Sequence, residues 1–285
     1  MTAPNPAATT PSRPEAPPAP RTVLLTGAAG GVGGFLRESL PGYGYQLRLT
    51  DLAPVPGAPD ALAVDLRDQD AVRAAVRGVD AIVHLGGLSL EDTFENILDA
   101  NIRGSYHLYE AARLEGVRRV VLASSNHAVG FVPRPEQPRQ DELPVDVPPR
   151  PDTYYGLSKC FGESLASLYA DKYGVETVSL RIGSCFATPR NTRMLSTWLS
   201  PADAARLVHA ALTAPRVHHR VVYGISANTR GWWDLAPARA LGYDPQDDSE
   251  QYAAEVLAAH GELVPGTAEY RFLGGAFTET EPERP

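Results

Sequence analysis

The chain has 285 residues, of which 43% are hydrophobic and 21% are charged, and its net charge is −8. This length and composition favour one large α/β domain, or one domain with a small lobe, and the acidic balance gives no support for a nucleic-acid surface. No stretch approaches the ~20 apolar residues of a membrane-spanning helix. We therefore expect neither nucleic acid nor a membrane among the partners of this protein.

Two cysteines, Cys160 and Cys185, fit neither a metal-binding spacing nor a disulfide framework. So few thiols in a chain of this length indicate a reducing compartment, which predicts a cytoplasmic location. Both cysteines are expected to be packed thiols. The pair His218 and His219 has no metal-ligand spacing to Cys185 and is expected on the surface, so the sequence predicts no metal site.

Residues 1–20 are rich in proline and alanine and contain no apolar segment of the kind found in a secretory signal. A segment of this composition cannot bury enough apolar surface to become ordered. We therefore expect residues 1–20 to form a disordered tail.

The first ordered segment is predicted to be a strand at residues 23–26 that leads into a glycine-rich turn and then into a helix. Gly27, Gly30 and Gly33 have the spacing G-x-x-G-x-x-G. Glycine tolerates positive φ and lets the backbone approach a pyrophosphate, while the amides and dipole at a helix start attract the anion. The phosphate-binding residues predicted from this turn are Gly27, Gly30, Gly31, Val32 and Gly33.

An acidic residue follows the turn at the spacing of a dinucleotide site. Asp51 ends a strand predicted over residues 45–50 and lies 18 residues beyond Gly33. Its carboxylate can accept hydrogen bonds from both hydroxyls of an adenosine ribose, whereas it would repel a 2′-phosphate. The pattern predicts NAD rather than NADP as the cofactor; the alternative is a glycine turn followed by a surface aspartate.

Strand and helix patterns alternate along the rest of the chain, which predicts a Rossmann-type, doubly wound parallel sheet. Predicted strands cover 61–66, 81–85, 119–123, 177–182 and 217–225, and predicted helices cover 68–77, 94–115, 153–173 and 201–212. Ser200 is the expected N-cap of the last helix. His84, inside a strand, is expected to be a hydrogen-bonded core residue.

The same pattern divides the chain into three parts. After the tail at 1–20, we expect an NAD-binding domain at 21–182 and a small C-terminal substrate-binding lobe at 183–285 that is interleaved with the last strands. Residues 131–150 include six prolines. They are expected to cross the surface as a loop over the mouth of the site.

Tyr155 and Lys159 are the clearest sign of chemistry. They are four residues apart on a predicted helix and share one face, while Ser125 closes a predicted strand at its carboxyl end. An ammonium near the phenol, together with the positive ring of an oxidised nicotinamide, would favour phenolate, and the serine would hold the reacting oxygen. We therefore predict Tyr155 as the proton acceptor, assisted by Lys159 and Ser125. Taken alone, Tyr155 and Lys159 could be ordinary residues of a helix surface.

These motifs resemble the extended short-chain dehydrogenases/reductases, which include the NAD-dependent nucleotide-sugar epimerases and dehydratases. A narrower resemblance, to the uronate dehydrogenases, covers most of the chain after residue 21. It is carried by residues 84–89, 124–127, 155–163, 181–185, 193–198, 226–228, 231–234 and 271–277. The N-terminal tail and the charged loop at 134–146 depart from the family pattern.

The resemblance implies oxidation of the C1 hemiacetal of D-glucuronate or D-galacturonate by NAD, with an aldarolactone as the product. It makes a small anionic sugar the expected partner, with its carboxylate on the parallel donors of Arg193. The implied substrate-binding residues are Ser89, Ser125, Asn126, His127, Tyr155, Ser184, Arg193 and Phe272. The implied cofactor-binding residues beyond the glycine turn and Asp51 are Asp65, Leu66, Leu85, Gly86, Gly87, Tyr155, Lys159 and Ile182.

Two further expectations come from the resemblance. Asn101 either supports a backbone bulge or a water near Lys159, or is an ordinary helix residue. Long helices that pair between subunits in the family make a homo-oligomer the expected assembly.

Other functions stay open on the sequence. A nucleotide-sugar epimerase or dehydratase would retain a recycled NAD and carry a larger C-terminal lobe than the residues after Gly183 provide. A non-catalytic NAD-sensing protein would usually lack one member of the pair Tyr155 and Lys159, and both are present. The two uronates differ at a single hydroxyl, so the motifs favour neither.

Overall fold

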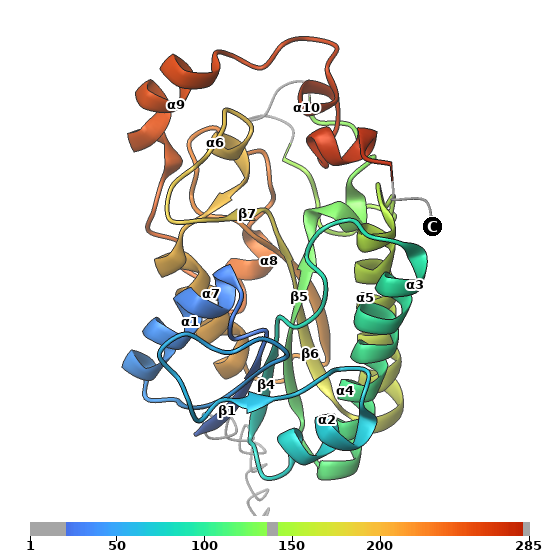
Figure 1. Ribbon diagram of the computed structural model, residues 1–285. Coiled ribbons are helices and arrows are strands. Elements are labelled where there is room, and N and C mark those ends of the chain that lie inside the picture. Colours follow the sequence, from blue (N-terminus) through green and yellow to red (C-terminus); the bar gives the residue numbers. More distant parts are fainter. Residues whose placement is uncertain (1–20, 136–141, 282–285) are drawn as a thin grey trace, which may run out of the picture.

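The computed structural model describes residues 21–135 and 142–281, so the predicted tail at 1–20 lies outside the described residues. At its centre is a seven-stranded, all-parallel sheet with the order β3-β2-β1-β4-β5-β6-β9. Helices cover both faces of the sheet (Figure 1), which confirms the predicted Rossmann-type, doubly wound fold. Its strands are β1 (Thr22–Thr26), β2 (Gln46–Asp51), β3 (Leu62–Ala63), β4 (Ala81–His84), β5 (Arg119–Ser125), β6 (Glu176–Ile182) and β9 (His219–Gly224).

The strand order places a crevice at the carboxyl ends of β1 and β4. The chain leaves β1 through α1 (Gly31–Ser39) and η1 (Leu40–Tyr43) to pair β2 on one side of β1, and β4 pairs on the other side. The connections that follow β1 and β4 therefore run in opposite directions and separate at this edge of the sheet. Ligands of doubly wound sheets bind at such a point.

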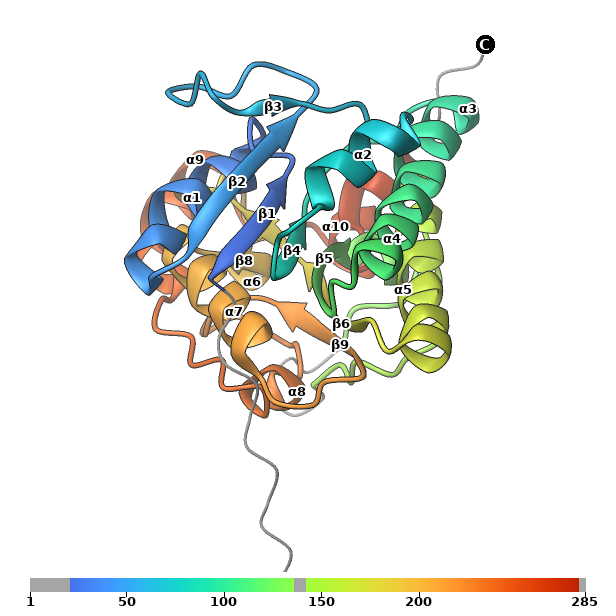
Figure 2. The ribbon, with the colours of Figure 1, turned by 90° about the horizontal axis from the view of Figure 1, so that it is seen from below.

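A hydrophobic core on each face follows from the alternation of side chains along the strands. Val23 and Leu25 belong to one cluster with Leu207 of α7 (Pro201–Thr213), whereas Leu24 belongs to the other with Leu108 of α4 (Gly104–Glu115). Figure 2 shows α1 and α7 on one side of the sheet and α2 (Gln69–Val76), α4 and α5 (Tyr154–Tyr173) on the other. The strands are buried on both faces, as parallel sheets require.

Two predicted elements differ from the structure. The strand predicted at 61–66 is reduced to β3, because the chain turns after it and the Asp65 carboxylate accepts a hydrogen bond from the Arg67 amide at 2.9 Å. The single helix predicted at 94–115 is divided into α3 (Phe94–Ile97), a π-helical segment η2 (Leu98–Arg103) and α4. The wider turns of η2 bring Asn101 into a buried position, and such π-helical turns often occur at functional sites.

The helix starts agree more closely with the sequence. Ser200 caps α7 as predicted, because its side chain accepts a hydrogen bond from the Asp203 amide. Asp68 caps α2 in the same way through the amides of Asp70 and Ala71. Within the described ranges, no helix has both the length and the apolar character needed to cross a bilayer.

Beyond β6 the chain contributes both to the sheet and to the region above its carboxyl edge. The elements α7 and β9 return to the sheet, whereas Figure 1 shows α6 (Met194–Thr197), α9 (Ala253–His260) and α10 (Ala268–Arg271) above it. The other elements are η3 (Asn126–Val129), the paired strands β7 (Ser184–Cys185) and β8 (Trp198–Leu199), α8 (Ala236–Arg239), η4 (Ser249–Tyr252) and η5 (Gly275–Glu279). The division into domains at residue 182 stays a prediction.

The described ends of the proline-rich loop lie against this upper region. Pro133 forms an isolated bridge with Phe272, and Leu143 forms another with Trp233. Residues 136–141 of the loop lie outside the described residues. The loop is thus held to the C-terminal part of the chain at both of its described ends.

Two neighbouring glycines of α1 offer a test of the close approach between the turn and the helix. A Cβ at position 33 would lie 2.1 Å from the Gly27 carbonyl oxygen, whereas a Cβ at position 34 would meet nothing within 4 Å. We expect Gly33→Ala to lower the free energy of unfolding by about 1–3 kcal/mol. Gly34→Ala, the matched control, should leave it unchanged or raise it by up to ~1 kcal/mol, because alanine is the better helix former. Urea denaturation of both variants measures this, and equal effects would contradict the packing argument.

Candidate active site

The glycine-rich turn leaves a helix start open at the mouth of the crevice. Gly27 has φ of +71°, and a Cβ there would lie 2.8 Å from the Leu85 carbonyl carbon. The helix α1 begins at Gly31 with Gly30 as its N-cap, and no described side chain caps it and no acidic residue lies in its first turn. Its first amides, including that of Val32, are therefore available to a phosphate group, and a pyrophosphate fits this turn.

Asp51 is fixed beside that turn at the end of β2. One carboxylate oxygen accepts from the Ala29 amide at 2.9 Å and the other accepts from the Ala53 amide at 3.0 Å. Each carboxylate oxygen has a further lone pair. The position and the chemistry of Asp51 therefore fit the ribose hydroxyls of NAD.

The opposite side of the crevice is formed by the segment that follows β4. The amides of Leu85 and Gly86 donate to the carbonyl and hydroxyl oxygens of Thr26, and the Thr26 hydroxyl is 2.8 Å from His84 Nδ1. His84 is a buried, hydrogen-bonded core residue, as predicted. Burial lowers the pKa of His84 to about 3, so the ring is neutral at physiological pH.

The family resemblance predicts that Asp65 and Leu66 lie at the adenine side of this crevice. The Leu66 side chain would meet a Cβ at Gly86 at 3.0 Å, so it packs against that backbone. The Asp65 carboxylate pairs with Arg67 at 2.6 Å, and this hydrogen bond lowers the pKa of Asp65. The arrangement places an apolar side chain in the crevice and the acidic one toward solvent.

Asn101 holds the loop after β4 to helix α5. Its Oδ1 accepts from the Leu88 amide at 2.7 Å, and its Nδ2 donates to the Leu88 carbonyl at 2.9 Å and to Ser158 Oγ at 3.1 Å. Gly87, with φ of +125°, is in contact with the same side chain. Of the two expectations for Asn101, the structure agrees with support of the backbone near Lys159 rather than with an ordinary helix residue.

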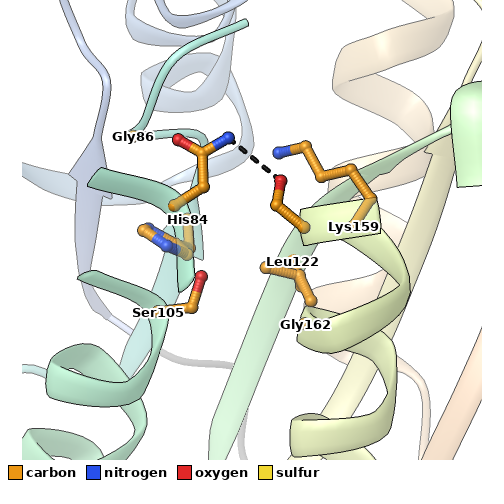
Figure 3. Close-up of a pocket in the computed structure, with 8 residues that line it drawn as sticks. His84, Gly86, Ser105, Leu122, Lys159 and Gly162 are labelled. Carbon is orange, nitrogen blue, oxygen red and sulfur yellow. Dashed lines mark hydrogen bonds between the residues drawn. The ribbon is translucent and has the colours of Figure 1, made fainter. Parts of the chain in front are cut away.

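The predicted proton-transfer residues meet at the carboxyl end of β5. The side chains of Ser125 and Tyr155 are hydrogen-bonded to each other, and Lys159 Nζ lies 5.2 Å from the centroid of the Tyr155 ring. The Lys159 ammonium donates to the Ala123 carbonyl at 2.9 Å. Figure 3 shows the Lys159 side chain across a small cavity from His84 and Ser105.

Burial governs the protonation of both groups. It raises the pKa of Tyr155 to about 12, and the hydrogen bond with Ser125, which acts in the opposite direction, is the weaker effect. Burial also lowers the pKa of Lys159 to about 8, against the neighbouring carboxylate of Glu163. In the ligand-free protein the phenol is thus protonated at neutral pH, because burial outweighs the lowering by Ser125. The depression of the Tyr155 pKa expected from Lys159 and a bound nicotinamide stays a prediction.

A buried side chain, Asn126, and a half-buried one, Arg193, meet at the carbonyl of Leu273. Asn126 Nδ2 donates to the Leu273 carbonyl at 3.2 Å, and the Arg193 guanidinium donates to the same oxygen. Among the described residues Arg193 Nε has no partner. Burial lowers the pKa of Arg193 to about 10, opposed by the charges of Asp152 and Glu269. A buried guanidinium with an unused donor is suited to an anion.

The other predicted substrate residues differ in their neighbours and in their exposure to solvent. His127 lies beside Tyr155, with 5.9 Å between the ring centroids. Ser184 is buried and its hydroxyl is 2.9 Å from that of Thr197, while Ser89 is exposed in the loop after β4. Ile182, predicted on the cofactor side, ends β6 directly opposite Ser125.

Two aromatic side chains of the closing segment, Phe272 and Phe277, have different neighbours. Phe272 packs edge-to-face on Phe131, with 5.7 Å between centroids, whereas Phe277 stacks on His127 at 4.0 Å. Both residues lie in the same closing segment, and no local pattern separates them. The role of Phe272 in substrate binding stays a prediction.

Sequence reasoning also missed two carboxylates. Asp152 is buried and accepts from His127 Nδ1 at 2.7 Å. Glu91 accepts from the amides of Tyr154 and Tyr155 at 3.0 Å and 2.9 Å, so it caps α5 from a distant loop. Asp152 and Glu91 each lie beside a predicted loop, which is a weak signal. Their partners, His127 and the start of α5, are far away in the sequence, so no local pattern connects them.

Comparison with known proteins agrees with this geometry. Residues 23–234 match the model of the NAD dependent epimerase/dehydratase family. The chain belongs to this family. The family description names the cofactor expected from the glycine turn and Asp51, so the prediction of NAD is confirmed.

Relatives within the family are more specific. The chain is 49% identical to a protein of Pseudomonas putida named uronate dehydrogenase, over 91% of this chain and 96% of that protein. It is 48% identical to a uronate dehydrogenase of Agrobacterium fabrum, over 91% and 97% of the two chains. A crystal structure of a uronate dehydrogenase variant from Agrobacterium tumefaciens, complexed with NAD, has a TM-score of 0.86 at 46% identity and covers 93% of this chain and 99% of that chain. These matches confirm the resemblance drawn from the motifs.

The buried ammonium of Lys159 predicts a dependence of stability on pH. Because the pKa of Lys159 is about 8 in the folded protein, the unfolded chain keeps this proton to higher pH, so the contribution of Lys159 to stability rises between about pH 8 and 10.5. At pH 7, Lys159→Met should therefore raise the free energy of unfolding by about 1–3 kcal/mol, and this gain should shrink toward pH 10.

Urea denaturation at pH 7 and at pH 9.5 measures this difference. Lys172→Met, at an exposed position near the end of the same helix, is the matched control and should show no such change. A gain for Lys159→Met that is the same at both pH values would contradict the assignment.

Proposed function

We propose that this chain is an NAD-dependent uronate dehydrogenase that oxidises the C1 hemiacetal of D-glucuronate or D-galacturonate to the aldarolactone. The observation that carries the proposal is the meeting of Asn126 and Arg193 at the Leu273 carbonyl. Because Asn126 follows Ser125 directly, this contact joins the proton-transfer group to the buried guanidinium. A sugar acid bound there has its anomeric hydroxyl near Tyr155 and its carboxylate near Arg193.

Tyr155 accepts the proton of the C1 hydroxyl, and Ser125 holds the C1 oxygen while the proton moves. The high pKa of the ligand-free phenol, about 12, keeps Tyr155 protonated until positive charge is close to it. The ammonium of Lys159, 5.2 Å from the ring centroid, is already in place in the ligand-free protein, so the further positive charge that favours the phenolate is that of the oxidised nicotinamide ring when NAD is bound. NAD, when bound, supplies the acceptor for the hydride of C1.

The chain's own residues hold the cofactor on the other side of the crevice. In this proposal the amides of the glycine turn bind the pyrophosphate and Asp51 binds the adenosine ribose. Leu66 and the backbone at Gly86 and Gly87 line the cofactor path. Loss of the O1 proton and the C1 hydride turns the cyclic hemiacetal into a lactone directly, so the step consumes no water.

Arg193 is the residue that recognises a sugar acid rather than a neutral sugar. Its guanidinium is buried, its Nε is without a partner among the described residues, and burial already lowers its pKa. A carboxylate would compensate that charge and use the remaining donors. The proposal also includes the expected cytoplasmic location and a homo-oligomeric assembly.

The assay of this function is the formation of NADH from NAD with either uronate. Tyr155→Phe should lower kcat by about 10²–10⁴-fold, the contribution typical of a general base, while the affinity for NAD is retained. Tyr154→Phe, at the exposed neighbouring position, is the matched control and should keep the parent activity. Absence of turnover by the parent protein on both uronates would refute the function, and full activity of Tyr155→Phe would refute its role.

Substitution of Arg193 tests the selection for charge. We expect Arg193→Gln to lower kcat/KM for D-galacturonate by about 10²-fold or more, since a buried carboxylate then lacks its partner, with little change for D-galactose. Arg190 lies three residues earlier and is exposed, so Arg190→Gln serves as the control. An equal loss on the acid and on the neutral sugar would contradict carboxylate recognition by Arg193.

A further inference from the structure

Asp152 lies just before α5, and its carboxylate is enclosed by three separate segments of the chain. The side chain is 0% exposed. A Cβ at Gly130 or Gly274 would lie 2.0 Å or 1.8 Å from Asp152 Oδ2, and a Cβ at Gly156 would lie 3.0 Å from Oδ1. Each of these positions accommodates the carboxylate only because it has no side chain.

Burying a carboxylate is costly unless hydrogen bonds or an opposite charge compensate it. Asp152 Oδ2 accepts from His127 Nδ1 at 2.7 Å, and Oδ1 accepts from the Thr153 hydroxyl at 3.0 Å. Within the described residues, His127 is the side chain that forms an ion-pair contact with Asp152. His127 therefore makes the direct charged contact with Asp152, beside the more distant positive charge of Arg193, and His127 is held in return.

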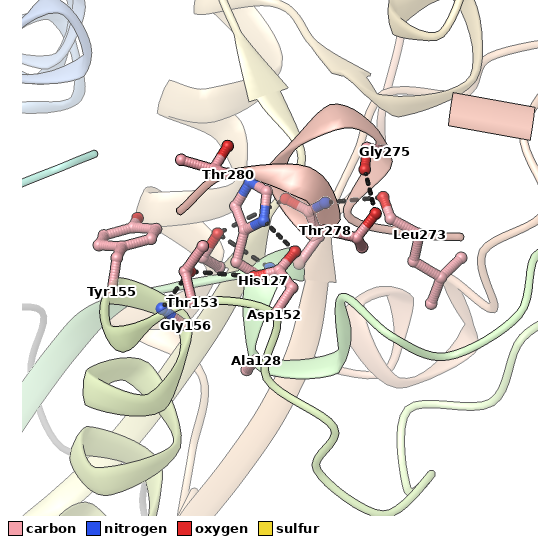
Figure 4. A network of polar contacts seen from close by, with 12 residues as sticks. His127, Ala128, Asp152, Thr153, Tyr155, Gly156, Leu273, Gly275, Thr278 and Thr280 are labelled. Atoms are coloured by element: carbon pink, nitrogen blue, oxygen red, sulfur yellow. Dashed lines mark hydrogen bonds and ion pairs between the residues drawn. The ribbon is translucent and has the colours of Figure 1, made fainter. Parts of the chain in front are cut away.

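This contact determines which nitrogen of His127 is available to a ligand. An ionised carboxylate can only accept, so Nδ1 must carry a hydrogen and Nε2 is left for other partners. The ring is also held by Phe277, which stacks on it at 4.0 Å, and by the edge of Tyr155. Figure 4 shows His127 between Tyr155 and Thr278, with one ring nitrogen on Asp152.

We propose that Asp152 is a positioning residue that holds His127 with Nδ1–H on the carboxylate and presents Nε2 to a sugar hydroxyl. The inference rests on the proposed function only for the identity of the ligand. A hydrogen bond to a hydroxyl that takes no part in the reaction is made equally in the ground state and in the transition state. Its loss should therefore act on KM rather than on kcat.

The first test uses the ligand-free protein and no activity. The ¹⁵N chemical shifts of the His127 ring, assigned by comparison with His127→Gln, report which nitrogen carries hydrogen. We expect a protonated Nδ1 in the parent protein. In Asp152→Asn, whose amide can donate as well as accept, we expect Nδ1 to lose its hydrogen in part of the molecules.

A second carboxylate–histidine pair provides the matched control. His218 and Asp171 are 3.0 Å apart, but both side chains are exposed. Asp171→Asn should leave the His127 signals unchanged. An unprotonated Nδ1 in the parent protein, which requires no variant to fold, would overturn the proposal, as would full protonation of Nδ1 in a folded Asp152→Asn.

Kinetics provide a second test. For D-galacturonate, Asp152→Asn should raise KM roughly 10-fold, the equivalent of one hydrogen bond, with kcat changed by less than about 3-fold. Because Asp152 acts through His127, adding Asp152→Asn to His127→Gln should cause no further loss. Additive effects of the two substitutions would show a separate structural role and overturn the proposal. If the parent protein oxidises no uronate, the proposed function fails and the ¹⁵N measurement still decides the position of His127.

Discussion

The first turn of α5 is the constraint on which the site depends, because its amides are satisfied by side chains from outside the helix. Glu91, from the loop after β4, accepts from the first two amides, and Thr153 accepts from the third. An uncapped helix start inside a protein is costly, so these contacts fix α5 in register with the end of β5. Tyr155 is one of the residues whose amide is held in this way, and its hydroxyl is placed beside Ser125 as a result.

Three side chains of the site are held in environments that disfavour their charged forms. Burial raises the pKa of Tyr155 and lowers those of Lys159 and Arg193. At neutral pH the lowered pKa values of Lys159 and Arg193 mean that the protein loses stability to keep these two charged groups in place, whereas the raised pKa of Tyr155 has no such cost there, because the phenol is neutral in both the folded and the unfolded chain. The carboxylate of a bound anionic sugar would compensate the positive charge of Arg193. The positive nicotinamide ring of bound NAD would favour the phenolate form of Tyr155. The stability that is lost by burying these charged groups and the affinity of the site for a charged ligand therefore have the same origin. Such a trade between stability and activity is common.

The parts of the fold and site that the sequence predicted are those that local pattern controls. Three local patterns placed residues correctly in the fold. They are the glycine spacing for Gly27, an acidic residue at the end of a strand for Asp51, and the four-residue separation of Tyr155 from Lys159 on a helix. Asp152 could not be found in this way, since His127 is 25 residues earlier and the glycines around it come from three segments. The π-helical turn at Asn101 was missed for the same reason, because the hydrogen-bond partner of Asn101 there, Leu88, lies in the separate loop after β4.

The C-terminal segment contributes to the surroundings of Asn126, His127 and Arg193. Its Leu273 carbonyl receives hydrogen bonds from Asn126 and Arg193, and its Phe277 ring covers His127. Gly275, with φ of +61°, lies where a side chain would collide with Arg193, so the backbone at this position packs directly against the Arg193 side chain. Backbone hydrogen bonds also hold this segment, from the Leu273 amide to the Val132 carbonyl and from the Gly274 amide to the Gly130 carbonyl. In the proposed function this segment therefore acts on the sugar side through Asn126, His127 and Arg193, while the proton-transfer residues lie on β5 and α5.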